Sequence, residues 1–372
     1  INGFTETYGD PLSYKASWES IVNFKNVSAT KRTELISDNA QWFEDNAPIQ
    51  DKYKKDEVKG VSAKVITAAI LGGDCYPATP IGVNLPNADW IRKEYGSKSV
   101  TIQNITEAYA ESGKGSGFQE EFVLREEDRE RMKLYGTLAD NLHTDLHECL
   151  GHGSGQLAPG VSRDALKQYS SVKEEARADL FALYYLADKK LVQLGITPNQ
   201  ELYKAEYASY VMNGMMTQLA RIELGKDVEQ THMRNRKLNG EWAYDLGKTD
   251  NVIEKTVIDG KTYIVINDFD KLRDIFGQML REVQRIKSEG DFAAAQNLVE
   301  KYSVKIDYNL HKEVLDRYSA LNIQPYSGFV NPVYTPVMEN GQIVDVIYDY
   351  PGSYVEQMLD YSSSYSFLPS KN

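Results

Sequence analysis

The chain has 372 residues, of which 41% are hydrophobic and 26% charged, and this composition excludes both a small disulfide-stabilised protein and a disordered chain. Lys and Arg number 42 against 54 Asp and Glu, so the net charge is −12 and a phosphate backbone would be repelled. No apolar run reaches the ~20 residues that a membrane span needs. We therefore expect neither a nucleic-acid partner nor a membrane span.

In the first two thirds of the chain, the residue pattern predicts a helix, then an extended region, then consecutive helices. A helical pattern covers Lys31 to Asp45. Residues 58–85 are rich in Gly, Pro and β-branched side chains, which predicts extended or looped backbone. From Ile102 to about Arg236 charged faces and apolar stripes recur with helical period, so we expect consecutive helices there.

The remaining third predicts two hairpins and further helices. Asp259-Gly260 lies between the strand-forming runs 252–258 and 262–266, which is a strong signal for a two-residue hairpin turn. Asn340-Gly341 gives the same signal within residues 323–350. Helices are expected over three further ranges, 269–287, 292–301 and 311–318.

The sharpest chemical signal is the stretch His147-Glu148-Cys149-Leu150-Gly151-His152. A histidine pair with a glutamate after the first is the order used when one helix supplies two zinc ligands and a general base. The usual spacing is four residues; a spacing of five separates the two side chains by about 140° on a regular helix. We therefore expect a wide turn with i→i+5 hydrogen bonds, for which Gly151 supplies backbone freedom.

A third metal ligand is expected elsewhere, because a catalytic zinc site has three protein ligands and one open position. The stretch Lys173 to Asp179 contains Glu174 and Glu175 in a helical pattern, and Glu175 is the candidate. On the residues alone a solvated helix face explains this stretch equally well, and His147 and His152 could be ordinary polar residues. Imidazole and carboxylate ligands would also hold cobalt or manganese.

Both motifs, in this order, resemble those of the dipeptidyl peptidase III family of zinc metallopeptidases. Three further stretches resemble other elements of that family: Glu6-Thr7-Tyr8-Gly9-Asp10-Pro11, Asn84-Leu85-Pro86-Asn87 and His232-Met233-Arg234-Asn235-Arg236. Five separated motifs in the right order cover residues 6–236, so the chain is identified as a bacterial-type member of the family.

The resemblance implies a role for each site residue. One zinc ion would be bound by His147, His152 and Glu175, and Glu174 and Asp179 would orient the two histidines. Glu148, Tyr8 and His232 would act in catalysis. The substrate would be bound by Glu6, Asn84, Asn87 and Arg236. Tyr8 or His232 could instead be a core residue, Asn84 and Asn87 could shape a turn, and Glu174 and Asp179 could form a surface face.

The expected fold is a mostly helical α+β protein of two lobes with the substrate cleft between them. A mixed α/β lobe of residues 1–30, 58–100 and 323–372 would recognise the substrate N-terminus. A mainly helical lobe of residues 31–57 and 101–322 would bind zinc. Family members carry a long region before the Glu-x-Tyr element, so this chain is expected to be the C-terminal catalytic portion of a longer protein.

The expected function is zinc-dependent hydrolysis of the second peptide bond of short peptides with a free N-terminus. The alternatives are a zinc endopeptidase or aminopeptidase, and an inactive peptide-binding fragment of such an enzyme. We expect a monomer and a cytoplasmic location. The first residues show no signal peptide. The chain begins at Ile1 rather than Met, so we expect the native N-terminus to be missing, and export stays open for that reason.

Overall fold

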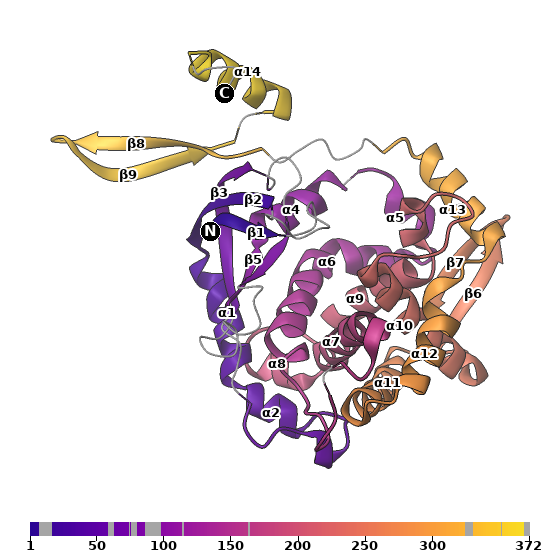
Figure 1. Ribbon diagram of the computed structural model, residues 1–372. Helices are drawn as coiled ribbons and strands as arrows, with labels where there is room; N and C mark the ends of the chain where they lie inside the picture. The colour runs from indigo at the N-terminus through magenta and orange to yellow at the C-terminus, as the bar shows by residue number, and fades with distance from the viewer. Residues whose placement is uncertain are drawn as a thin grey trace. The chain divides into compact units, whose positions relative to one another are not determined.

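The computed structural model describes residues 1–6, 17–58, 63–73, 75, 80–85, 98–113, 115–162, 164–323, 330–350 and 352–367. The chain divides into two compact units. The sheet unit consists of Ile1–Thr30, Lys64–Ser112 and Gln324–Asn372, and the helical unit of Lys31–Ala63 and Gly113–Ile323. The protein is a mostly helical α+β chain, as the sequence predicted (Figure 1).

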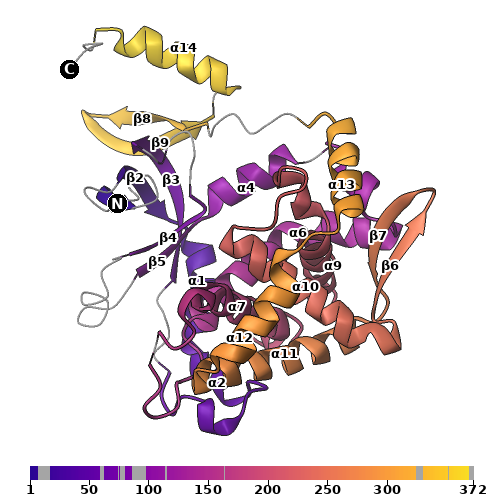
Figure 2. The ribbon, with the colours of Figure 1, turned by 45° about the vertical axis from the view of Figure 1, so that its right-hand side comes forward.

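The helical unit is built around α7, Ser170–Leu186, which packs against α6, α9, α10 and α11 (Figures 1 and 2). Leu180, Phe181 and Leu183 on α7 are at most 1% exposed, because a helix that is apolar on most sides is stable only when other helices surround it. The surrounding helices are α6 (Glu126–Leu146), α9 (Leu202–Met215), α10 (Thr231–Gly247) and α11 (Phe269–Glu289). The central position of α7 gives its polar residues a rigid support.

Shorter elements complete the helical unit. Its α-helices are α2 (Ala40–Asp45), α5 (Phe118–Phe122), α8 (Lys189–Gln193), α12 (Phe292–Val299) and α13 (Tyr308–Ala320). Single 3₁₀ turns cover Asp51–Tyr53, Lys167–Tyr169, Thr217–Arg221 and Lys248–Asp250, and π-helical turns cover His147–Gly151 and Glu300–Val304.

The sheet unit contains a five-stranded sheet of order β1-β2-β3-β5-β4. Its strands are β1 (Asn2–Glu6), β2 (Ser17–Lys25), β3 (Ala63–Gly73), β4 (Gly82–Leu85) and β5 (Lys98–Ile102). Ile21 and Leu71 from one face form a core with Ile105 of α4, Gln103–Ser112. The opposite face leaves Val22 and Ile70 about half exposed, as expected for a sheet covered by a helix on one side.

Both predicted hairpins are confirmed. β6 (Ile253–Ile258) pairs antiparallel with β7 (Lys261–Ile266), and β8 (Val333–Glu339) pairs antiparallel with β9 (Gln342–Asp349). Asp259-Gly260 and Asn340-Gly341 both have positive φ, between 50° and 77°, at the two turn positions. This is the conformation that Asp-Gly and Asn-Gly adopt most readily.

Other expectations need adjustment. The helical pattern at Lys31–Asp45 corresponds to two helices, α1 (Val27–Asp38) and α2, separated at Asn39. The helix α14, Tyr354–Tyr365, was not predicted, although Ser353 caps its first turn by accepting a hydrogen bond from the Glu356 amide. Within the described ranges, no helix is both long and apolar enough to cross a membrane.

Candidate metal centre

The histidine pair lies on the wide turn that the five-residue spacing predicted. Helix α6 ends at Leu146 and continues as a π-helical turn, His147–Gly151, in which the His152 amide donates to the His147 carbonyl oxygen over 3.2 Å. The extra residue in this turn brings the two imidazole rings to a centroid separation of 4.7 Å. The prediction of an i→i+5 turn is confirmed.

The reason for glycine at position 151 differs from the expected one. Gly151 is not among the residues with positive φ, so backbone freedom is not what this position needs. A Cβ atom here would lie 2.8 Å from the Ala178 Cα atom. The missing side chain therefore allows the π-helical turn to pack directly on α7.

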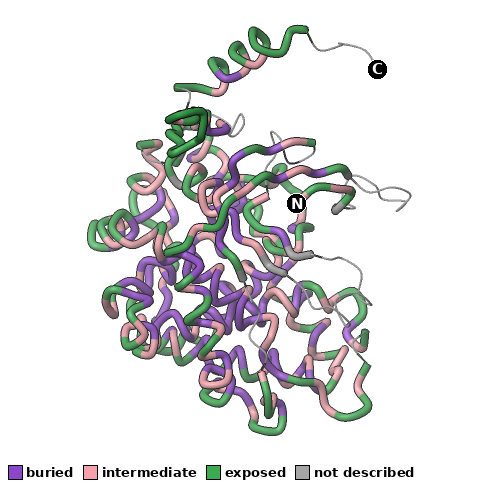
Figure 3. The backbone as a smooth tube through the Cα atoms, turned by 90° about the vertical axis from the view of Figure 1, so that its left-hand side faces the viewer, coloured by how far each residue is buried: buried purple, intermediate pink, exposed green. Residues whose placement is uncertain are grey.

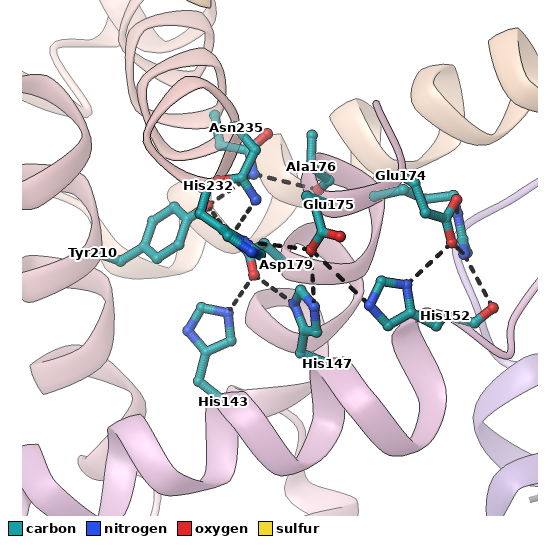
Figure 4. Close-up of polar contacts among 12 residues, drawn as sticks. His143, His147, His152, Glu174, Glu175, Ala176, Asp179, Tyr210, His232 and Asn235 are labelled. Atoms are coloured by element: carbon teal, nitrogen blue, oxygen red, sulfur yellow. Dashed lines mark hydrogen bonds and ion pairs between the residues drawn. The ribbon is translucent and has the colours of Figure 1, made fainter. Parts of the chain in front are cut away.

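Three imidazole nitrogens converge on one carboxylate oxygen of Glu175 (Figure 4). The Glu175 Oε2 atom lies 3.3 Å from His147 Nε2, 4.0 Å from His152 Nε2 and 3.6 Å from His232 Nδ1. This oxygen is buried and has no hydrogen-bond partner. Since a buried carboxylate oxygen normally has a partner, its surroundings fit those of a cation ligand.

Each histidine of the pair contacts a second carboxylate through its other ring nitrogen. His147 Nδ1 lies 2.7 Å from Asp179 Oδ1, and His152 Nδ1 lies 3.2 Å from Glu174 Oε1. These contacts fix the rings with their Nε2 atoms toward Glu175 (Figure 4). Carboxylates in this position orient metal-binding imidazoles and raise their basicity.

The charges of the site stabilise the ionised carboxylates. Burial acts to raise the pKa of Asp179, but hydrogen bonds with His143 and His147 hold it well below its ordinary value. Burial likewise opposes ionisation of Glu174, whereas the positive charge of Arg177 keeps its pKa well below normal. Both carboxylates are therefore negative and act as acceptors for the imidazole N–H groups.

The glycine-rich loop after His152 is held by two buried charges. Glu44 accepts hydrogen bonds from the Ser154 hydroxyl, over 2.6 Å, and from the Gly155 amide, over 2.9 Å. Arg177, which is fully buried, donates to the Ser154 carbonyl oxygen over 3.0 Å. The loop is thus fixed to both α2 and α7, which limits the movement of His152.

Among the described residues, two groups have ligand atoms close enough to one another to hold a metal ion. One consists of His143, His147 and Asp179, all buried, and the other of His147, Glu148 and His152. In the first group the ring nitrogens of His143 already contact two carboxylates, Glu206 Oε1 at 2.6 Å and Asp179 Oδ1 at 3.2 Å. In the second group Glu148 is half-buried, next to the two histidines.

Only part of the expected site lies within the described side chains. His147, Glu148, His152, Glu174, Glu175, Asp179 and His232 lie close together, and Arg236 follows His232 by one turn of α10 and is half-buried. Tyr8 and Asn87 lie outside the described residues, as do the side chains of Glu6 and Asn84. The expectations for those four residues stay predictions.

Sequence reasoning gave no role to His143, Glu206 or Tyr210, which also belong to this cluster. His143 precedes His147 by four residues on α6, and this helical spacing was a signal that could have identified it. Glu206 and Tyr210 come from α9, and nothing in the sequence near the motifs points to them.

Comparisons with known proteins agree with the geometry. The family model described as Peptidase family M49 matches residues 1–167, which include His147, Glu148 and His152 but not Glu175. The chain is 25% identical over 343 residues to dipeptidyl peptidase 3 of Nematostella vectensis, covering 81% of this chain and 45% of that protein. It is 28% identical over 305 residues to Nudix hydrolase 3 of Arabidopsis thaliana, covering 80% of this chain and 36% of that protein.

Solved structures share the fold. The DPP III from Caldithrix abyssi superimposes with a TM-score of 0.70 at 22% identity, covering 85% of this chain and 58% of that chain. The dipeptidyl-peptidase III from Corallococcus sp. strain EGB gives a TM-score of 0.65 at 24% identity, covering 87% and 57%. The chain spans less than half the length of the two curated relatives described above. With the family match over residues 1–167, the relatives and the shared fold together, the chain resembles the peptidase M49, or dipeptidyl peptidase III, family.

Proposed function

We propose that this chain is the metal-binding part of a zinc-dependent dipeptidyl peptidase that releases dipeptides from the free N-terminus of short peptides. The observation that carries the proposal is the buried Glu175 Oε2 atom, which has no hydrogen-bond partner and faces nitrogens of His147 and His152. Two imidazoles and one carboxylate form a ligand set that catalytic zinc uses, with one position left open.

The alternative ligand set, His143 with His147 and Asp179, fits less well. Asp179 Oδ1 already contacts both imidazoles, and its Oδ2 accepts hydrogen bonds from the Tyr210 hydroxyl and the Asn235 amide. A metal ion there would have to replace contacts that are already made. The Glu175 side of His147 offers an oxygen without a hydrogen bond instead.

The residues around the centre have chemically distinct roles in this proposal. Zinc, when bound, supplies a Lewis acid that polarises the scissile carbonyl and lowers the pKa of water to ~7. Glu148 takes a proton from the attacking water and passes it to the leaving amine. His232, together with Tyr8, donates hydrogen bonds to the developing oxyanion, a contribution of about 3–4 kcal/mol for one donor.

The chemistry of the remaining residues suits recognition of a substrate N-terminus and so supports the assignment as a dipeptidyl peptidase. An ammonium group donates hydrogen bonds and is best met by carboxylate and amide oxygens, which Glu6, Asn84 and Asn87 would supply. Arg236 would bind a carbonyl or carboxylate of the peptide. The names of the relatives, dipeptidyl peptidase 3 among them, favour the same substrate class.

The test measures the zinc content of the protein and its hydrolysis of peptides. We expect one zinc per chain by elemental analysis, and release of dialanine from pentaalanine but not from N-acetylated pentaalanine. Glu148→Gln should keep the zinc and lose about 10²–10⁴-fold in kcat, because the general base is removed. Glu127→Gln, in the first turn of α6, the helix that leads into the π-helical turn of Glu148, serves as the control and should keep both.

Each of the other possible results would support a different function or contradict an assigned role. Cleavage of the acetylated peptide at its second bond would indicate an endopeptidase, and release of single alanines would indicate an aminopeptidase. Zinc binding without any hydrolysis would indicate a peptide-binding fragment. Full activity of Glu148→Gln would contradict the assigned base.

A further inference from the structure

His143 is a buried histidine whose two ring nitrogens both contact carboxylates. It lies on α6 one turn before His147, and its side chain is 10% exposed. Its Nδ1 atom lies 2.6 Å from Glu206 Oε1, and its Nε2 atom lies 3.2 Å from Asp179 Oδ1. Each ring nitrogen thus faces a carboxylate oxygen, so the imidazole is held between two acidic side chains from different helices.

The Asp179 carboxylate is the point at which His143 meets the metal centre. Its Oδ1 atom is shared between His143 Nε2 and His147 Nδ1, and the second of these contacts is 2.7 Å. Its Oδ2 atom accepts from the Tyr210 hydroxyl over 2.7 Å and from the Asn235 amide over 3.0 Å. Donors from α6, α9 and α10 thus hold a carboxylate of α7 from several sides (Figure 4).

The positions of α6 and α9 in this cluster are linked by the Glu206 contact. Glu206 is 5% exposed and lies one turn before Tyr210 on α9, so the same helix supplies a base for His143 and a donor for Asp179. If His143 were removed, Asp179 Oδ1 would lose one of its two imidazole contacts, and Glu206 Oε1 would lose its 2.6 Å contact with an imidazole nitrogen. The ring of His147 would then be oriented by a less constrained carboxylate.

We propose that His143, held by Glu206, is a positioning residue that fixes the Asp179 carboxylate and thereby the ring of His147, and is not itself a metal ligand. This inference rests on the proposed function, in which the metal lies on the Nε2 side of His147. Contacts of this kind with metal-binding histidines typically change metal affinity about 10–100-fold when removed.

The test uses zinc and cobalt affinities of the full chain, measured by competition with a chelator. His143→Gln should weaken zinc binding about 10–100-fold while one ion still binds, and the visible spectrum of the cobalt form should keep its bands. His152→Ala, which removes an assigned ligand, should weaken binding far more and change the spectrum. Glu206→Gln removes the carboxylate that holds His143, so it should also weaken zinc binding, but by less than His143→Gln does.

Two further variants test the route through Asp179. Asp179→Asn should itself weaken zinc binding, and the double variant with His143→Gln should be no weaker than Asp179→Asn alone, because both changes act on one contact. His311→Gln is the matched control: His311 is 1% exposed and its Nε2 contacts the Ile222 carbonyl oxygen, so this change should affect stability but not zinc affinity.

Three results would overturn the inference. Wild-type zinc affinity in both folded His143→Gln and Glu206→Gln would mean that the contacts are only structural. A loss as large as that of His152→Ala, with a changed cobalt spectrum, would make His143 a ligand. Additive losses in the double variant would exclude the route through Asp179. A wild-type chain that binds no zinc would instead refute the proposed function, and this inference with it.

Discussion

Arg177 is the fully buried cation that connects the metal centre with the loop beyond it. Its Nη2 atom donates to Glu174 Oε1 over 2.6 Å and its Nη1 atom to the Ser154 carbonyl oxygen over 3.0 Å. Glu174 in turn contacts His152, so one guanidinium positions both a carboxylate and the backbone that follows the second histidine. Its planar arrangement of donors suits this double task.

Replacing Arg177 with lysine should therefore be damaging although the charge is kept. A single ammonium cannot reach both Glu174 and Ser154, so one buried acceptor loses its donor, which costs about 1–3 kcal/mol. We expect Arg177→Lys to lower the free energy of unfolding of the zinc-free chain by about 2 kcal/mol, measured by urea unfolding.

The control is Arg285→Lys on α11. Arg285 also binds carboxylates, among them Glu282 and Glu289, but these are partly exposed. Exposed ion pairs contribute about 0–1 kcal/mol, so the control should change stability by no more than that. Equal losses in the two variants would contradict the structural role given to Arg177.

At the residue scale, local spacing decided what could be predicted. His147, Glu148 and His152 lie within six consecutive positions, and their chemistry follows from residue type and helical geometry. Glu44, which holds the loop, lies 110 residues before Ser154 in sequence. A pairing over such a distance is set by packing of the whole unit and leaves no local pattern.

At the scale of elements, the π-helical turn and α7 depend on close contact at Gly151. A Cβ atom at this position would lie 2.8 to 2.9 Å from atoms of Ala178, including its carbonyl oxygen. We expect Gly151→Ala to reduce the free energy of unfolding by about 1–3 kcal/mol, the usual range for overpacking. Zinc affinity should fall as well, because the turn that carries both histidines must shift.

Gly153→Ala is the matched control for this change. Its added Cβ atom would lie 3.6 Å from the Leu150 carbonyl oxygen, an ordinary contact distance, and Gly153 has no positive φ. Thermal unfolding measures the stability of the two variants, and competition with a chelator measures their zinc affinity. Wild-type behaviour of Gly151→Ala would mean that the turn and α7 can separate without loss.

Arg317 joins three elements of the helical unit and should determine part of its acid stability. It donates to Glu121 of α5 over 2.6 Å, to Glu313 of its own helix α13 over 2.8 Å, and to the Thr262 carbonyl oxygen of β7 over 2.7 Å. Burial acts to raise the pKa of Glu121 and Glu313, but the hydrogen bonds that they accept lower both below the ordinary 4.5.

A carboxylate with a lowered pKa in the folded state stabilises the protein above its unfolded pKa and loses that contribution as the pH falls. We expect Arg317→Met to cost about 3 kcal/mol at pH 7, and the difference from wild type to shrink as the pH falls below about 4.5. Urea unfolding across this pH range measures the effect. Lys312→Met, which removes an exposed ion pair on the same helix, is the control, and a difference from wild type that does not vary with pH would contradict the assignment.

At the scale of the whole molecule, the two hairpins look alike in sequence and differ in surroundings. Both turns were predicted from the residue pairs Asp-Gly and Asn-Gly, because turn conformation is a local property. In β6–β7 the residues Ile253, Val265 and Ile266 are at most 4% exposed. Every residue of β9 is exposed, including Ile343 and Ile347, and this difference could not be predicted from the turn (Figure 3).

This difference should appear in the rate of amide hydrogen exchange. A two-stranded hairpin is marginally stable in water unless a hydrophobic face is packed, so β8–β9 should open far more often than β6–β7. We expect the amides of 333–349 to exchange at least about tenfold faster than those of 253–266 in the same protein, measured by mass spectrometry. The buried hairpin is thus an internal control of the same turn type. Equal protection of both would mean that β8–β9 is covered in solution, for instance by a second copy of the chain, and dilution would then release the protection.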